Sequence, residues 1–229
     1  MRRLTIVFSL IGLLLFIIQP SIAQFSIGGN IGLTRIKFNG DVSKGVSRFQ
    51  PDPGFSAAAR LDYRISEVIS LSVQPGVSTL RSRYQVMNDS GTAVVDSIRL
   101  TLTSFSLPLH ALVWSENGRF YVLAGMQLDY TLGFKPEVLM SPTSSTMNYD
   151  VRDYNLYLQF GAGYIIPLGK PYLTFELRYS QGILDLTAPP IQQETYLSRT
   201  KLTNISLMVG LQVPLGAYSE KYPIKRKAR

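Results

Sequence analysis

The chain has 229 residues, a formal charge of +8, no cysteine and a single histidine. Without cysteine it forms neither a disulfide nor a thiolate metal site, and one histidine leaves little for a metal cluster or a catalytic triad, so no cofactor is expected. Much of the charge is local. Arg2 and Arg3 carry +2, and residues 217–229 carry five basic side chains against Glu220, so 8 − 2 − 4 leaves about +2 for the body. No nucleic-acid partner is therefore expected.

The first 23 residues have the pattern of a secretory signal peptide. Arg2 and Arg3 precede an apolar run over residues 4–18, and Ala23 supplies a small residue at a cleavage site. The alternative is an uncleaved membrane anchor, but 15 apolar residues fall short of the roughly 18 to 20 that span a bilayer. We expect cleavage after Ala23 and a mature chain that begins at Gln24.

From residue 25 onward, apolar and polar residues alternate in eight separate segments. A period of two is typical of a β-strand with one apolar and one polar face. After the signal peptide no second apolar run of about 18 residues occurs, which excludes a helical membrane protein. The predicted strands cover about residues 25–34, 55–63, 69–78, 98–114, 120–130, 154–164, 173–179 and 204–213.

The fourth of these segments changes phase at its middle. Apolar residues stand at even positions over residues 98–102 and at odd positions from Phe105 onward. An extra residue in a strand shifts the alternation by one position. We therefore expect a β-bulge near Thr103 and Ser104.

The connections between the segments alternate between long and short. Four are long and polar or proline-rich, whereas three have about five residues each. Short periplasmic turns and long outer loops are typical of membrane barrels. The sequence thus predicts an all-β protein: an eight-stranded antiparallel up-and-down transmembrane β-barrel over residues 24–216, in the cell outer membrane, with both ends periplasmic. The long connections are residues 36–53, 86–96, 134–151 and 182–199, and the short ones are residues 64–68, 115–119 and 167–171.

A soluble barrel with an apolar interior is the alternative, because a period of two does not say which face points outward. Three features oppose it. The polar faces carry glycines that suit a crowded lumen, their charges have both signs, and aromatic residues gather near strand ends as in interfacial girdles. These aromatic residues are Tyr63, Trp114, Phe120, Tyr130, Tyr154, Tyr164 and Tyr172.

The charged residues on the polar faces are candidates for an ion-pair network inside the barrel. The interior of an eight-stranded barrel is just wide enough for its own side chains to fill it. A charge in so narrow a lumen must find a partner or lose its charge. We therefore expect a plugged lumen rather than a conducting pore. The candidate residues are Arg60, Asp62, Asp129, Glu176 and Arg178.

The single histidine, His110, raises the question of an enzyme. Ser106 shares its strand face, but positions i and i+4 on a strand lie roughly 13 Å apart, too far for direct nucleophilic activation. A partner from another strand is not visible in the sequence. We expect a buried or lumenal histidine near the periplasmic rim, no catalytic or metal-binding residues, and a protein that is not an enzyme.

Residues 217–229 form a basic tail on the predicted periplasmic side. One hypothesis is a solvated, frayed terminus. The other is docking on an acidic lipid or protein partner. The candidate docking residues are Lys221, Lys225, Arg226, Lys227 and Arg229.

Several stretches resemble the PorT family of outer-membrane barrels of Bacteroidetes. They are FSIGGNIGLTRIKFNGD over residues 25–41, SFSLPLHALVW over 104–114, YVLAGMQLDYTLG over 121–133, YLQFGAGYIIPLG over 157–169 and LRYSQGI over 177–183. The resemblance covers nearly the whole mature chain, including the Ala-Gln junction after residue 23. Its motifs are glycine and aromatic patterns of barrel strands, so it implies the barrel fold and no particular activity.

The sequence as a whole predicts a small outer-membrane barrel with a plugged lumen that acts as a structural or interaction protein. Its expected partners are outer-membrane lipid and a protein at the periplasmic rim or the outer loops. Through the resemblance, the alternative function is a subunit of a type IX secretion and gliding machinery. A remote alternative is a lipid A-modifying enzyme.

Overall fold

A computed structural model describes residues 24–39, 47–88, 90, 92–140, 151–186 and 201–215. The predicted signal peptide and the predicted basic tail, with Lys221, Lys225, Arg226, Lys227 and Arg229, lie outside these residues. No helix in the described part of the chain is long and apolar enough to cross a membrane.

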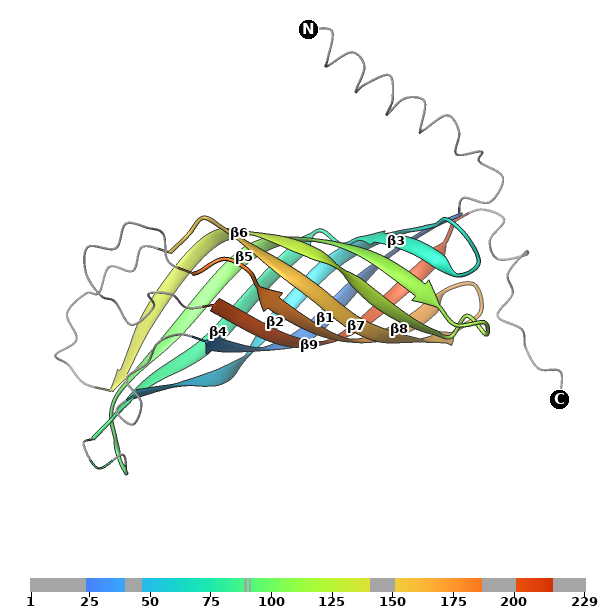
Figure 1. Ribbon diagram of the computed structural model, residues 1–229. Helices are drawn as coiled ribbons and strands as arrows, with labels where there is room; N and C mark the ends of the chain where they lie inside the picture. Colours follow the sequence, from blue (N-terminus) through green and yellow to red (C-terminus); the bar gives the residue numbers. More distant parts are fainter. Residues whose placement is uncertain are drawn as a thin grey trace, which may run out of the picture.

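The described residues form one antiparallel sheet that closes on itself (Figure 1). β1 pairs with both β2 and β9, so the sheet has no free edge. Both β3 and β4 lie between β2 and β5 and share one place in the ring. The ring therefore has eight strand positions, which confirms the predicted eight-stranded barrel. The strands are β1 Gln24–Asn39, β2 Ser47–Arg64, β3 Ile69–Val73, β4 Gly76–Met87, β5 Val94–Trp114, β6 Phe120–Met140, β7 Tyr154–Pro167, β8 Tyr172–Gly182 and β9 Lys201–Pro214.

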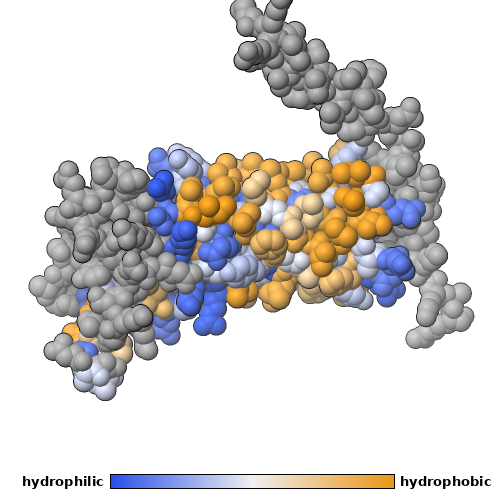
Figure 2. All heavy atoms as spheres, viewed as in Figure 1, coloured by the Kyte–Doolittle hydropathy of each residue, from blue (hydrophilic) through white to orange (hydrophobic). Residues whose placement is uncertain are grey.

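Alternate residues of each strand point to opposite sides of the barrel wall. On β1, Ile27 and Leu33 are 50% and 62% exposed, whereas Asn30 between them is 3% exposed. On the face seen in Figure 2, apolar residues form a band over the middle of the barrel, with hydrophilic residues at both ends. An apolar outside around a polar inside is the reverse of a soluble barrel, so the alternative of a soluble barrel with an apolar interior is wrong.

The third predicted strand is split in two by Gln74 and Pro75. Proline has no backbone N–H to donate to a neighbouring strand. The backbone N–H of Gln74 instead bonds to Pro108 O at 3.1 Å, and Ala59 N–H donates to Pro75 O at 2.9 Å. Strand pairing then resumes at Gly76, so the break interrupts the barrel wall only briefly.

The predicted bulge lies at the expected place, but it does not explain the phase change. The register of β5 with β6 shifts between Thr103 and Ser104 because β6 carries one extra residue, Leu132. On β5 itself, the even positions are buried from Ile98 to Trp114. The expectation that a bulge keeps all apolar residues of this segment on one face is therefore wrong. The apolar residues Ile98, Leu100 and Leu102 point inward.

Three predicted long connections begin or end as strand. β5 and β6 each extend over 21 residues, and β2 already begins at Ser47. Inward residues of β5 belong to an apolar cluster at the long-connection end of the lumen, and Phe49 of β2 and Phe134 of β6 pack against this cluster. This outer cluster comprises Ile36, Leu80, Tyr84, Ile98, Leu100, Leu102, Tyr157, Leu186 and Leu202.

Candidate functional site

The lumen holds a cluster of charged side chains from β2 and β8. Arg60 and Asp62 stand two residues apart on β2, and Glu176 and Arg178 two residues apart on β8. Residues two apart on a strand share a face, so each pair projects to the same side. All four are at most 5% exposed. Two arginines and two carboxylates make the cluster neutral overall.

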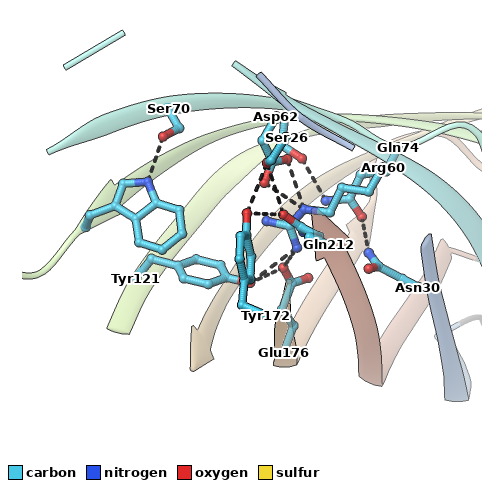
Figure 3. A network of polar contacts seen from close by, with 12 residues as sticks. Ser26, Asn30, Arg60, Asp62, Ser70, Gln74, Tyr121, Tyr172, Glu176 and Gln212 are labelled. Atoms are coloured by element: carbon cyan, nitrogen blue, oxygen red, sulfur yellow. Dashed lines mark hydrogen bonds and ion pairs between the residues drawn. The ribbon is translucent and has the colours of Figure 1, made fainter. Parts of the chain in front are cut away.

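Glu176 lies between the guanidinium groups of Arg60 and Arg178, and Figure 3 shows its side chain beside Arg60. One carboxylate oxygen, Oε1, pairs with Arg60 Nη1, and the other accepts a hydrogen bond from Arg178 Nε at 2.7 Å. Arg60 also pairs with its own neighbour, Asp62, through Nε at 2.9 Å. Each buried charge thus faces an opposite charge, as burial in a medium of low dielectric constant requires.

This cluster extends across the full width of the lumen. Arg178 Nη2 donates to Gln74 Oε1 at 2.6 Å, and Asn30 Nδ2 donates to the same oxygen at 2.9 Å. Gln74 follows β3, which lies four strand positions from β8 in either direction around the ring. A direct hydrogen bond therefore joins opposite walls of the barrel.

Aromatic and amide side chains complete the shell around Arg60. The Tyr121 hydroxyl donates to Glu176 and accepts from Arg60 Nη1 at 3.3 Å. Gln212 places its amide oxygen 2.5 Å from Arg60 Nε and its nitrogen 3.1 Å from Asp62 Oδ2. We name the group comprising Arg60, Asp62, Gln74, Tyr121, Glu176, Arg178 and Gln212 the lumen network.

Asp129, the fifth charged residue expected in this network, lies apart from it. Its carboxylate accepts a hydrogen bond from Gln127 Nε2 at 2.6 Å, and no arginine or lysine of the described residues pairs with it. Gln127 in turn accepts from Gln159 at 2.5 Å, and Gln159 Oε1 lies 2.6 Å from His110 Nε2. A chain of two amides therefore connects the only histidine to this carboxylate.

The remaining space in the lumen is small. A cavity of about 40 Å³ lies beside Asp129, Tyr157 and Arg178, and one of about 20 Å³ lies beside Trp114. The larger cavity can hold a few water molecules. In the described part of the chain, no group of three or more histidine, aspartate or glutamate residues is placed to hold a metal ion.

A family model described as the outer membrane protein beta-barrel domain matches residues 19–188. The chain belongs to this family. As an outer-membrane barrel, it has its apolar band in the lipid and its polar cluster inside the wall, in agreement with the outward and inward alternation of its strands.

Several solved outer-membrane proteins have a similar fold. Ail of Yersinia pestis is 12% identical, with a TM-score of 0.42 over 84% of this chain and 99% of Ail. OprG of Pseudomonas aeruginosa is 14% identical, with a TM-score of 0.44 over 85% of this chain and 97% of OprG. AlkL is 16% identical, with a TM-score of 0.42 over 84% of this chain and 90% of AlkL. A search of curated protein sequences finds no significant match.

Two aromatic residues expected in the interfacial girdle of the barrel point inward instead. Trp114 and Tyr172 are only 7% and 8% exposed and belong to a second apolar cluster, at the short-turn end of the lumen. Trp114 Nε1 donates to Ser70 Oγ at 2.7 Å. Trp114 and His110 both stand at even positions of β5. The expected lumenal position of His110 therefore already indicated that Trp114 faces the lumen. The inner cluster comprises Leu112, Trp114, Tyr121, Leu123, Ile165 and Tyr172.

Three members of the lumen network were not predicted as site residues from the sequence. Gln74, Tyr121 and Gln212 stand on the predicted polar faces, so alternation alone indicated that they face the lumen. Their roles depend on which residues lie at the same height in the barrel, which the stagger between strands decides. Sequence alternation within one strand does not contain that information.

Proposed function

We propose that this outer-membrane barrel has a plugged lumen and acts as a structural or interaction protein through its outer surfaces. The observation that carries the proposal is the hydrogen bond between Arg178 and Gln74, because it joins opposite walls of the barrel. A water-filled channel needs a continuous polar path. Here the lumen network crosses that path, and apolar clusters lie at both ends.

Planar-bilayer recording tests the plugged lumen. The wild-type protein should show no steady conductance after insertion. The variant R60S/E176S/R178S removes three of the four charged side chains of the lumen network and should leak measurably more than wild type, because the space they fill becomes available to water.

A matched control exists on the outer wall. Asp52 Oδ2 lies 3.3 Å from Arg83 Nη2 and 3.5 Å from Arg99 Nε. One carboxylate thus lies between two guanidiniums, as Glu176 does in the lumen. D52S/R83S/R99S should therefore remain as silent as wild type. Steady conductance from the wild-type protein would refute the plugged lumen. If R60S/E176S/R178S showed no conductance, the two apolar clusters rather than the lumen network would close the lumen.

The finer roles expected from the sequence stay predictions. Membership of the PorT family and a place in a type IX secretion machinery are narrower than the family to which the chain belongs, and no contact described above favours them. Docking through the basic tail concerns residues outside the described part of the chain.

A lipid A-modifying activity also receives no support from the geometry around His110. The imidazole is 3% exposed, and its Nε2 contacts the amide of Gln159 rather than a hydroxyl. A nucleophilic site needs a hydroxyl or thiol within hydrogen-bond reach of the base and open to substrate. We therefore propose a role without catalysis.

A further inference from the structure

A row of cationic side chains crosses the outer wall of the barrel on β4, β5 and β6. Arg81 of β4 is in register with Thr101 of β5, and Thr101 is in register with Lys135 of β6. Strands lie about 4.8 Å apart, so Arg81 and Lys135 flank the threonine hydroxyl at a Cα separation of about 10 Å. Both cationic side chains are exposed. We name these three residues the cationic row.

Asp52 of β2 is in register with Arg81, but its carboxylate pairs with Arg83 and Arg99 of the next row toward the long connections. Within that next row, Arg99 also pairs with Glu137 of β6 at 3.2 Å. Within the described residues, neither Arg81 nor Lys135 forms an ion pair. Both carboxylates of this part of the wall therefore pair with Arg83 or Arg99, and Arg81 and Lys135 are left without an anionic partner among the described residues.

The cationic row lies at the edge of the apolar band. On the same three strands, Val77, Phe105 and Tyr130 are outward and 49%, 41% and 55% exposed. Thr79 and Thr103 follow, and the cationic row comes next toward the long connections. Figure 2 shows hydrophilic residues at this end of the barrel directly beside the apolar band.

Further cations continue this edge around the barrel. Arg35 and Lys37 on β1 and Lys201 on β9 are exposed and follow the lipid-facing residues Leu33 and Ile205 of the same strands. Long basic side chains at such a boundary extend from the apolar surface toward the headgroups. The charge at this end is therefore presented to lipid headgroups rather than to the lumen.

We propose that the cationic row binds a phosphate group of a negatively charged lipid in the outer leaflet. Arg81 and Lys135 supply charge-assisted hydrogen bonds from two sides, and the Thr101 hydroxyl between them donates a third. The long connections face outward in barrels of this kind, so the row lies at the outer leaflet. A lipid is the occupant because the row borders the band that lipid tails cover.

This inference names a partner for the interaction role proposed above and rests on that role. Its test is nevertheless separate from the test of the plugged lumen, because lipid binding and conductance are measured independently. A conducting barrel could still bind the lipid, and a silent barrel could fail to do so.

Native mass spectrometry of the purified full-length barrel tests the proposal. Wild-type protein is titrated with bisphosphorylated lipid A and with monophosphoryl lipid A, which differ by one phosphate. A basic residue near a charged membrane surface contributes about fivefold to binding. R81S/K135S should therefore bind bisphosphorylated lipid A roughly 30-fold more weakly than wild type at low salt and lose the preference for it.

The matched control removes two cations from the opposite end of the barrel. R119S/K170S changes the short turns and has the same net charge as R81S/K135S, so it should bind within about twofold of wild type. The single variants R81S and K135S should each show an intermediate loss. Gel mobility of unheated samples establishes that every variant is folded. Wild-type affinity in R81S/K135S, an equal loss in both double variants, or no lipid preference in wild type would overturn the proposal.

Discussion

At the scale of residues, the barrel places a carboxylate between two guanidiniums twice, once in the lumen and once on the outer wall. Glu176 lies between two guanidiniums inside the lumen with a side chain 0% exposed, and Asp52 lies between two guanidiniums on the outer wall with a side chain 16% exposed. Removing one partner of a buried ion pair leaves an uncompensated charge, whereas solvent screens a surface pair. The same chemical change should therefore have unequal costs at the two positions.

E176Q should lower the free energy of unfolding by about 3 to 5 kcal/mol, because Arg60 and Arg178 would keep only Asp62 as an anionic partner. D52N, the matched change on the outer wall, should cost about 1 kcal/mol or less. Urea unfolding in lipid vesicles measures both, with the single tryptophan, Trp114, as the fluorescent probe. Equal costs for the two variants would contradict a buried, charged lumen network.

The sequence predicted which charged residues face the lumen but not which of them meet. Alternation placed Arg60 and Asp129 alike on polar faces. In the structure Arg60 faces Glu176, whereas Asp129 bonds to Gln127 at a different height. Height depends on how far each strand is staggered against the next, and that stagger is a property of the closed ring. Partner choice therefore could not be read from single strands.

At the scale of elements, close contact between β5 and β6 depends on a residue without a side chain. A Cβ atom on Gly125 would lie 2.0 Å from the carbonyl oxygen of Leu109 and 2.8 Å from Cα of His110. Both atoms belong to the backbone of the neighbouring strand, so they cannot rotate away. Gly133 lies on the same strand, and a Cβ there would meet nothing within 4 Å.

G125A should therefore destabilise the barrel by about 1 to 3 kcal/mol through overpacking. G133A should change its stability by no more than about 0.5 kcal/mol. The temperature at which unheated gel mobility is lost ranks the two variants against wild type. A G125A barrel as stable as the G133A barrel would show that β5 and β6 are not this close.

The position of the strands was predictable from alternation, but the meaning of the phase change on β5 was not. Hydropathy alternation says which residues share a face and leaves open what covers that face. Within the apolar band the outer face is apolar, whereas beyond it Arg81 and Arg99 face outward and Ile98 and Leu100 face inward. The phase change therefore marks the edge of the lipid-facing zone. The backbone alternation of β5 itself continues without interruption from Ile98 to Trp114.

At the scale of the whole molecule, the lumen has three layers. The inner apolar cluster lies at the short-turn end, the lumen network and the Asp129 chain of amides lie in the middle, and the outer apolar cluster lies at the long-connection end. The number of strands and the closed ring followed from eight alternating segments and from connections that alternate in length. The two apolar clusters could not be predicted, because a sequence does not distinguish an apolar residue that faces the lumen from one that faces lipid.

Labelling of single cysteines tests the plugged lumen most directly, because the chain contains no cysteine of its own. Ser72 and Ser180 are each 1% exposed on opposite walls of the lumen, whereas Asn117 is exposed in a short turn. A water-soluble maleimide should label N117C in the folded barrel and should label S72C and S180C only after denaturation. Labelling of S72C and S180C in the folded barrel as fast as N117C would show an open, water-filled lumen and contradict the plug.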